Sequence, residues 1–245
     1  MIKIIIKIII TNNLLIKNKG SAENMVLIML GAPGTGKGTV ANILKEKLNI
    51  PQVSTGDIFR KHIKEQTELG KLADKYISQG HLVPDDVTID LVKHRLQEDD
   101  VKKGIILDGF PRTVVQAEAL DKMLKEQERQ VDMVINLITP KEEIIERIVN
   151  RRICSNPECK AIYNLVLNPP KKDGICDKCG STLIQRKDDN EETVELRLKN
   201  YFEITSPLIE YYTKQGKIHT EEVSVRINRL GKDVAQDIVK QFKRD

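Results

Sequence analysis

Val26-Leu27-Ile28-Met29-Leu30 runs directly into Gly31-Ala32-Pro33-Gly34-Thr35-Gly36-Lys37-Gly38-Thr39, and this stretch decides the fold. The short apolar run is typical of a strand that is buried on both faces of a parallel sheet. An amphipathic helix is expected to follow the glycines and to end before Pro51. Strand, glycine-rich loop and helix in this order are the context in which a phosphate-binding loop is found.

The glycine-rich loop has the chemistry to hold phosphate groups. Glycines let backbone N–H groups turn toward phosphate oxygens, and the N-terminus of the helix adds partial positive charge. We therefore predict that nucleotide phosphates bind to Gly34, Thr35, Gly36, Lys37, Gly38 and Thr39. Lys37 is expected to reach the terminal phosphates, and the alternative is a glycine-rich turn without a ligand. Gly38 follows the lysine where Ser or Thr is usual, so magnesium is expected to be held more through water than by the loop.

Two further apolar runs predict more strands of the same sheet. Ile105-Ile106-Leu107 ends in Asp108, which places a carboxylate at the carboxyl end of a strand, where α/β sheets bind ligands. The run from Met133 to Ile138 is followed by Thr139-Pro140-Lys141-Glu142, which predicts a helix start with a capping box. Alternating strands and helices indicate a doubly wound α/β fold.

Length and composition exclude several classes of protein. The chain has 245 residues and 27.9 kDa, which fits one compact domain with insertions or two small domains. Its net charge of +4 is too small to indicate a nucleic-acid partner. Aromatic residues make up 4% of the chain and Trp is absent, which argues against a stacking platform for single-stranded nucleic acid. Apolar runs fall short of the roughly 20 residues that span a bilayer, so no membrane partner is predicted.

The first 24 residues differ from the remainder of the chain. Their isoleucine-rich stretch is interrupted by Lys7 and lacks a small-residue cleavage site, so it does not fit a signal peptide. We expect residues 1–24 to be a disordered extension, or the product of an upstream start codon with Met25 as the natural beginning. A targeting segment or membrane anchor is the alternative.

The four cysteines are clustered in two pairs. Cys154 and Cys159 enclose four residues, Cys176 and Cys179 enclose two, and about sixteen residues separate the pairs. Four thiolates from two such turns suit a tetrahedral structural zinc ion, which leaves no open position for chemistry. A redox pair and two unrelated pairs of buried thiols are the alternatives. Clustered cysteines in a chain of this length indicate a reducing cytosol, so a cytoplasmic location is expected.

Asp108-Gly109-Phe110-Pro111-Arg112, together with the Gly31–Thr39 loop and Ser54-Thr55-Gly56-Asp57, resembles adenylate kinase of the zinc-containing, long-lid bacterial type. The resemblance runs from about Met25 to about Tyr212. It implies a parallel-sheet core of the P-loop NTPase type with helices on both faces. It also implies a helical AMP-binding flap and a zinc-containing lid. The expected boundaries are 25–53, 84–150 and 189–245 for the core, 54–83 for the flap and 151–188 for the lid.

The same resemblance implies an activity and site residues. The family interconverts ATP and AMP with two ADP, using magnesium. Besides the loop, it assigns to ATP the residues Arg151, Ile162 and Tyr163. It assigns to AMP the residues Thr55, Arg60, His81, Leu82, Val83, Gly109, Phe110, Pro111, Arg112, Gln116, Arg186 and Arg197. The catalytic set around the transferred phosphoryl group is Lys37, Arg112, Arg151, Arg186, Arg197 and Asp108, with Asp108 ordering magnesium-bound water.

Local patterns agree with parts of this assignment. Ser54 is expected to cap a helix, which places Arg60 one turn in, able to face an anion. Asp189 is predicted to cap a later helix with Glu192 reaching back, and Asp188 to orient arginines across the hinge.

Alternative functions remain open at this level. A kinase for another nucleoside monophosphate is one, and a zinc-ribbon nucleic-acid binder is a more remote one. The choice between ATP and GTP as donor is also open. The expected partners are ATP, AMP and ADP, with no nucleic acid, and a monomer is expected.

Overall fold

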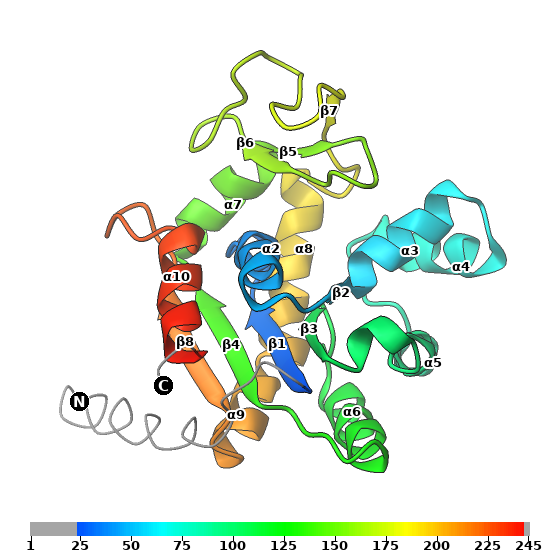
Figure 1. The fold of residues 1–245 in the computed structure, drawn as a ribbon. Coiled ribbons are helices and arrows are strands. Elements are labelled where there is room, and N and C mark those ends of the chain that lie inside the picture. The colour runs from blue at the N-terminus through cyan, green and yellow to red at the C-terminus, as the bar shows by residue number, and fades with distance from the viewer. Residues whose placement is uncertain (1–23, 243–245) are drawn as a thin grey trace.

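β1 (Met25–Gly31) lies in the middle of a parallel sheet. The computed structural model describes residues 24–242, and within them this sheet has five strands in the order β2-β3-β1-β4-β8 (Figure 1). The other strands are β2 (Gln52–Ser54), β3 (Gly104–Asp108), β4 (Met133–Ile138) and β8 (Ile218–Glu222). The two predicted strand positions are therefore confirmed, and the doubly wound α/β fold is confirmed with them.

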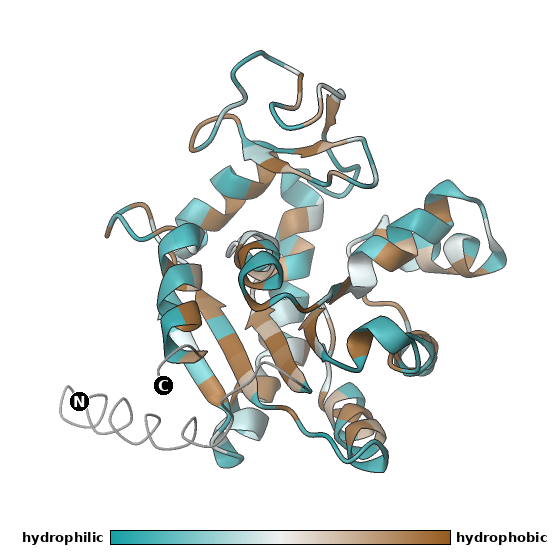
Figure 2. Ribbon diagram, in the orientation of Figure 1, coloured by the Kyte–Doolittle hydropathy of each residue, from teal (hydrophilic) through white to brown (hydrophobic). Residues whose placement is uncertain are grey.

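Alternate residues of β1 pack against different layers of helices. Val26, Ile28 and Leu30 belong to a core with helices α5 (Asp85–Arg95), α6 (Val114–Glu126) and α9 (Pro207–Lys214). Leu27 and Met29 belong to a core with α2 (Lys37–Leu48) and α10 (Gly231–Phe242). Because side chains alternate across a strand, a continuous apolar run is what a sheet covered on both faces requires. Figure 2 shows the result, with β1 and β3 mostly brown and the surrounding helices carrying both teal and brown residues.

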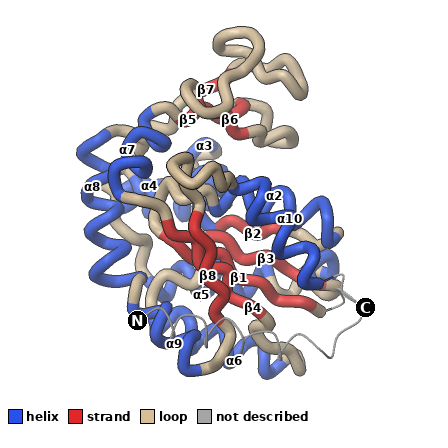
Figure 3. The backbone as a smooth tube through the Cα atoms, turned by 90° about the vertical axis from the view of Figure 1, so that its left-hand side faces the viewer, coloured by secondary structure: helices blue, strands red, loops and turns tan. Residues whose placement is uncertain are grey.

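Two smaller parts project from the sheet domain. A flap consists of α3 (Thr55–Lys64) and α4 (Glu68–Ile77), with an apolar cluster around Phe59 and Ala73. A lid contains β5 (Arg151–Cys154), β6 (Ile162–Asn164) and β7 (Leu183–Ile184), which form an antiparallel sheet in the order β6-β5-β7. Figures 1 and 3 both place the lid strands apart from the central sheet. The boundaries expected for the flap and lid as units stay a prediction.

Helices α7 (Lys141–Val149) and α8 (Glu191–Asn200) connect the lid to the sheet domain. They pack together through an apolar cluster that includes Ile144, Ile148, Val194 and Leu198. A short 3-10 helix, Asp99–Val101, and a π-helical segment, Tyr201–Thr205, complete the chain's helices within residues 24–242.

Three predicted helix caps have different outcomes. Ser54 caps α3 as predicted, since its hydroxyl accepts the N–H of Asp57 at 3.3 Å. The capping box at Thr139 is wrong, because its hydroxyl donates to the carbonyl of Val223 at 2.7 Å and α7 starts at Lys141. The cap at Asp189 is also wrong, because Asn190 caps α8. The carboxylate of Asp189 is thereby left for arginine.

Within residues 24–242, every helix is too short or too polar to cross a membrane. The extension expected at residues 1–24 lies outside the described residues, apart from Asn24.

Gly70 allows the two flap helices to approach closely. A Cβ at this position would lie 2.0 Å from the carbonyl oxygen of His62, which is backbone and cannot yield without moving α3. We predict that Gly70→Ala destabilises the protein by about 1–3 kcal/mol, because the two helices must separate. Thermal unfolding measures this, and Lys71→Ala on the exposed side of the same helix is the control. An unaltered melting temperature in Gly70→Ala would contradict the close packing.

Candidate functional site

The loop after β1 has the geometry of a phosphate cradle. Gly34 and Gly36 have φ angles of 81° and 92°, which side chains with a Cβ rarely adopt. The backbone therefore curls around the first turn of α2, which begins at Lys37. Lys37 Nζ donates to the carbonyl oxygens of Gly31 and Ala32, at 2.7 and 2.8 Å, so the ammonium lies within the loop.

Burial governs the charge of this lysine. It lowers the pKa of Lys37 to about 7, with the carboxylate of Asp108 opposing the shift and the guanidinium of Arg112 adding to it. A phosphate group bound in the loop would favour the ammonium form, since an opposite charge nearby stabilises it. The loop therefore holds a lysine whose charge state responds to the arrival of an anion.

Asp108 lies at the same edge of the sheet. It pairs in register with Ser54 of β2 and with Met29 of β1, two residues before the glycine loop. Gln52 donates to its carboxylate at 3.1 Å. Burial raises the pKa of Asp108, with the charge of Lys37 opposing the shift. Its carboxylate lies 3.8 Å from where a Cβ on Gly38 would be, so it faces the first turn of α2.

A pocket lies between the flap and the carboxyl end of β3. Residues from the flap, from the loop after β3 and from α8 meet in it. The predicted AMP residues that line it are Thr55, Arg60, His81, Leu82, Val83, Gly109, Arg112, Gln116 and Arg197.

Three predicted AMP residues do not line this pocket. Phe110 is fully buried in the core beneath the sheet, and Pro111 is buried beside it. Arg186 contacts the flap instead. The pocket also has lining residues that sequence reasoning missed, namely Gly56, Phe59, Ile77, Thr88 and Asp188. Phe59 could have been found, because it lies four residues after Thr55 and so on the same face of the expected helix.

Hydrogen bonds fix the polar wall of the pocket. Thr55 Oγ1 donates to the Gly109 carbonyl at 2.9 Å, and Arg112 Nε donates to the same oxygen at 2.9 Å. Gln116 accepts the backbone N–H of Arg112 and donates to Asp85 at 2.7 Å. Burial lowers the pKa of Arg112 to about 10, and the neighbouring Arg197 adds to the shift, so the guanidinium remains charged near neutral pH.

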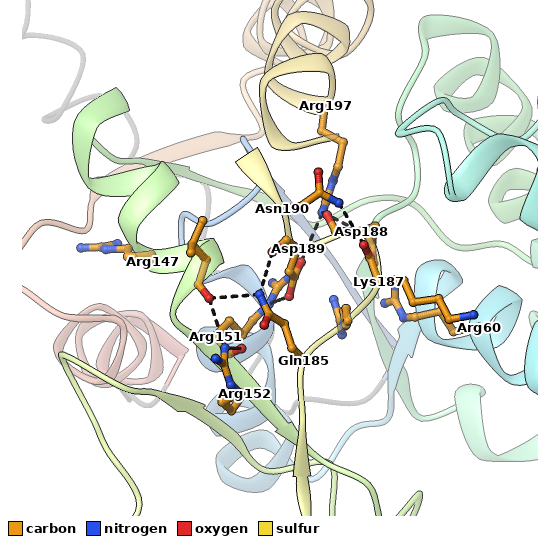
Figure 4. Close-up of polar contacts among 12 residues, drawn as sticks. Arg60, Arg147, Arg151, Arg152, Gln185, Lys187, Asp188, Asp189, Asn190 and Arg197 are labelled. Atoms are coloured by element: carbon orange, nitrogen blue, oxygen red, sulfur yellow. Dashed lines mark hydrogen bonds and ion pairs between the residues drawn. The ribbon is translucent and has the colours of Figure 1, made fainter. Parts of the chain in front are cut away.

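Two adjacent carboxylates orient the arginines at the base of the lid (Figure 4). Asp189 is almost fully buried, accepts from Arg151 Nε at 2.8 Å, and lies 3.5 Å from Arg197. Asp188 accepts from Arg197 at 3.1 Å. The role expected for Asp188 is confirmed for Arg197, whereas the carboxylate that binds Arg151 is Asp189. Its predicted role as a helix cap concealed this contact.

Asp57 joins the flap to the lid. Its carboxylate lies 2.6 Å from Arg60 on the same helix and 3.3 Å from Arg186 of the lid. Burial alone would raise the pKa of Asp57, but the charges of Arg60 and Arg186 outweigh it and the net shift is downward. Burial lowers the pKa of Arg186 to about 9, with Arg60 and Arg151 adding to the shift.

Successive residues of β6 point in opposite directions, as the pleat of a strand requires. Ile162 Cδ1 lies 3.5 Å from where a Cβ on Gly38 would be, so the side chain sits over the phosphate loop. Tyr163 is buried within the lid and its hydroxyl lies 3.5 Å from Cys176 Sγ. The ring of Tyr163 therefore faces the cysteines rather than the phosphate loop.

The four cysteines converge, although two separate hairpin turns supply them. Their sulfur atoms all lie within 4.8 Å of one another, with Cys154 and Cys179 at 3.4 Å and Cys159 and Cys176 at 3.7 Å. A tetrahedral ion with Zn–S bonds of about 2.3 Å requires sulfur atoms about 3.8 Å apart. All four thiols are free, so this donor set fits a zinc ion. Cys159, from the longer turn, belongs to the group.

Comparison with known proteins agrees with this geometry. A sequence model of the family "Adenylate kinase" matches residues 29–217. The chain belongs to the adenylate kinase family. It is 52% identical over 210 residues to the adenylate kinase of Archaeoglobus fulgidus, covering 86% of this chain and 96% of that protein. It is 51% identical to that of Acetivibrio thermocellus, with the same coverage, and 50% identical to that of Staphylococcus aureus, covering 86% of this chain and 97% of that one.

Family membership confirms the resemblance seen in the sequence. It identifies the chain as a nucleoside monophosphate kinase, a phosphotransferase, with a P-loop parallel-sheet core. Adenylate kinases use Mg²⁺ together with ATP, and the clustered cysteines of this member are compatible with a metal in the lid.

The shifted pKa of Lys37 predicts proton uptake when the donor nucleotide binds. In the enzyme without nucleotide, the amino group of Lys37 has a pKa of about 7, so it is largely neutral at about pH 8.5. Bound phosphates raise this pKa again. We expect Mg-ATP binding at this pH to take up about one proton, and the uptake to decline below pH 7, where the free amine is already charged.

Calorimetry in two buffers with different ionisation enthalpies measures the proton count. The control is Lys37→Arg, because its guanidinium is charged in both the free and the bound state. Equal heats for the unaltered enzyme in the two buffers would show that Lys37 is already charged before nucleotide binds.

Proposed function

We propose that this enzyme catalyses the reversible, magnesium-dependent reaction of ATP and AMP to two ADP, which balances the adenine nucleotides. The observation that carries the proposal is the position of the arginine cluster. Arg112, Arg151 and Arg197 lie close enough to Lys37 of the phosphate loop to lower its pKa. Arg60, Arg112 and Arg197 also line the pocket under the flap. A donor in the loop and an acceptor in the pocket would present their phosphates to one another across this cluster.

For the donor, the loop residues Gly34 to Thr39 bind the phosphates of ATP. Backbone N–H groups supply the contacts and Lys37 supplies the charge. Arg151 and the Ile162–Tyr163 segment approach from the lid, with Ile162 covering the first turn of α2. ATP rather than GTP as the preferred donor is part of this proposal.

For the acceptor, the pocket under the flap binds AMP. Its apolar wall of Phe59, Ile77 and Val83 suits a base, and Arg60 and Arg112 suit a phosphate. The remaining AMP residues are His81, Leu82, Gly109 and Gln116, with Phe110 and Pro111 shaping the loop and Arg186 and Arg197 reaching the phosphate side.

Phosphoryl transfer requires alignment and charge stabilisation more than covalent help from the protein. We assign the charge stabilisation to Lys37, Arg112, Arg151, Arg186 and Arg197. Guanidinium groups donate two parallel hydrogen bonds to phosphate oxygens and so fix direction as well as charge. Asp108 is the carboxylate in position to order water on the magnesium ion that accompanies ATP. Closing the lid would exclude water and so suppress hydrolysis of ATP.

The lid site is proposed to hold one structural zinc ion, bound by Cys154, Cys159, Cys176 and Cys179. With four thiolates around it the ion keeps no open position, so its role is to hold the lid's turns together. We further propose a monomeric, cytoplasmic enzyme that does not act on nucleic acid. The free thiols suit a reducing compartment, and the side chains of Arg186 and Arg197 are largely buried, which suits small phosphates better than a nucleic-acid backbone.

Purified protein with ATP, AMP and Mg²⁺ should form ADP, and Lys37→Met should lower kcat by about three orders of magnitude or more, because the positive charge that stabilises the moving phosphoryl group is lost. Lys45→Met, on the exposed side of the same helix, should leave the rate unaltered. A coupled assay with AMP, CMP, UMP and GMP as acceptors measures the specificity. Faster turnover with another acceptor would reject AMP, and full activity of Lys37→Met would reject the role of the loop.

Cys176→Ser should remove the metal and lower thermal stability more than it lowers the rate, since a structural zinc site can contribute roughly 10 kcal/mol to a small module. Metal content by elemental analysis and the melting temperature are the measurements. Ser155→Ala, beside a ligand but exposed, should leave both unaltered. A purified native protein without metal, or with its cysteines oxidised, would be inconsistent with the proposed site.

A further inference from the structure

Tyr163 lies inside the lid and not on the surface of the cleft. Its relative exposure is 6%, and its side chain belongs to a small apolar cluster with Cys154, Ala161, Cys176 and Leu183. The cleft-facing position of β6 is taken by Ile162. A phenol in this place needs a partner for its hydroxyl, because a buried hydroxyl without one is costly.

The hydroxyl has two partners, and one of them fixes its direction. The backbone N–H of Asp177 donates to the phenol oxygen at 2.8 Å. An N–H group cannot accept, so the phenol proton is free to point elsewhere. Cys176 Sγ lies 3.5 Å from the same oxygen. A metal-bound Cys176 thiolate has no proton to donate, so with a metal in the site the hydrogen bond runs from the tyrosine to the sulfur.

Cys176 is the least exposed of the four cysteines. It is 1% exposed, so water cannot solvate the thiolate, and backbone N–H groups of Lys178 and Cys179 are its other donors. Cys179 offers the contrast within the same site. It is exposed, with Ser181 Oγ at 3.4 Å, so water can replace that hydroxyl. A thiolate with negative charge in an apolar surrounding needs fixed donors.

We propose that Tyr163 is a positioning residue of the lid's metal site, whose phenol donates to the Cys176 sulfur and so strengthens metal binding. The inference rests on the proposed metal site. It gives this residue a task other than the contact with ATP that the family resemblance implies. Hydrogen bonds to metal ligands orient them and stabilise their charge, and the loss of one typically weakens metal affinity by about 10–100-fold.

The test is Tyr163→Phe in the full-length enzyme, which removes one oxygen atom and leaves the ring in the apolar cluster. Zinc affinity is measured by competition with a chromophoric chelator, and the number of thiolate ligands by the absorption spectrum with Co²⁺. We expect zinc to bind at least about tenfold more weakly, with the four-thiolate cobalt spectrum retained.

Two variants serve as matched controls. Tyr211→Phe removes a phenol oxygen that contacts Asp121, outside the lid, and should leave zinc affinity unaltered. Ser181→Ala removes the hydroxyl from the exposed sulfur and should weaken binding less than Tyr163→Phe.

The outcomes distinguish a failure of this inference from a failure of the proposed metal site on which it rests. Equal zinc affinity in Tyr163→Phe and the unaltered enzyme would overturn the inference alone. So would the loss of one thiolate from the cobalt spectrum, because Tyr163 would then hold the turn in place rather than stabilise a bound sulfur. An unaltered enzyme that binds no zinc would overturn the proposed site and the inference with it.

Discussion

Carboxylates at three positions hold the arginines of the site together, and the arrangement of the flap and the lid depends on these ion pairs. Two like charges about 4 Å apart repel by about 4 kcal/mol at an effective dielectric constant of about 20. Asp57, Asp188 and Asp189 offset this repulsion by lying between the arginines of the core, flap and lid. The guanidinium groups are therefore already gathered where phosphates would arrive. A phosphate has only to complete a set of charges that the protein has partly balanced.

The same ion pairs connect parts that are distant in the sequence. Asp57 lies in the first turn of α3 and Arg186 lies two residues after β7, so their contact joins the flap to the lid directly. Asp189 lies where the lid returns to α8, and its partner Arg151 lies where the lid begins. Both ends of the lid are thus tied to one carboxylate, which is almost inaccessible to water. Moving the lid means moving these arginines, so lid position and the charge pattern of the cleft are linked.

Much of this could be predicted from local sequence. The loop from Gly31 to Thr39 determines its own conformation, and the apolar runs alternate between two helical layers as buried strands must. The convergence of the cysteines also follows from their spacing. The two wrong predictions of helix caps have the same cause. Asp189 and Thr139 are suitable cap residues in their local sequence, but in the folded protein their side chains hydrogen-bond to Arg151 and to the Val223 carbonyl instead. The sequence places the carboxylate of Asp189 near the start of a helix, but only the tertiary structure shows that Arg151 binds it.

The strand β6 has one face toward the phosphate loop and the other toward the cysteines of the lid. Its period of two residues directs Ile162 toward the phosphate loop and Tyr163 toward the cysteines. The neighbouring strand β5 carries Arg151 at one end and Cys154 at the other, so it connects the cysteine-bearing turns to the arginines at the base of the lid. The strands of this antiparallel sheet are only two to four residues long, so it presents little of the hydrophobic face that a sheet needs for stability alone. A metal held by its turns would fix the register of the strands, and the register determines that Ile162 rather than Tyr163 faces the phosphate loop.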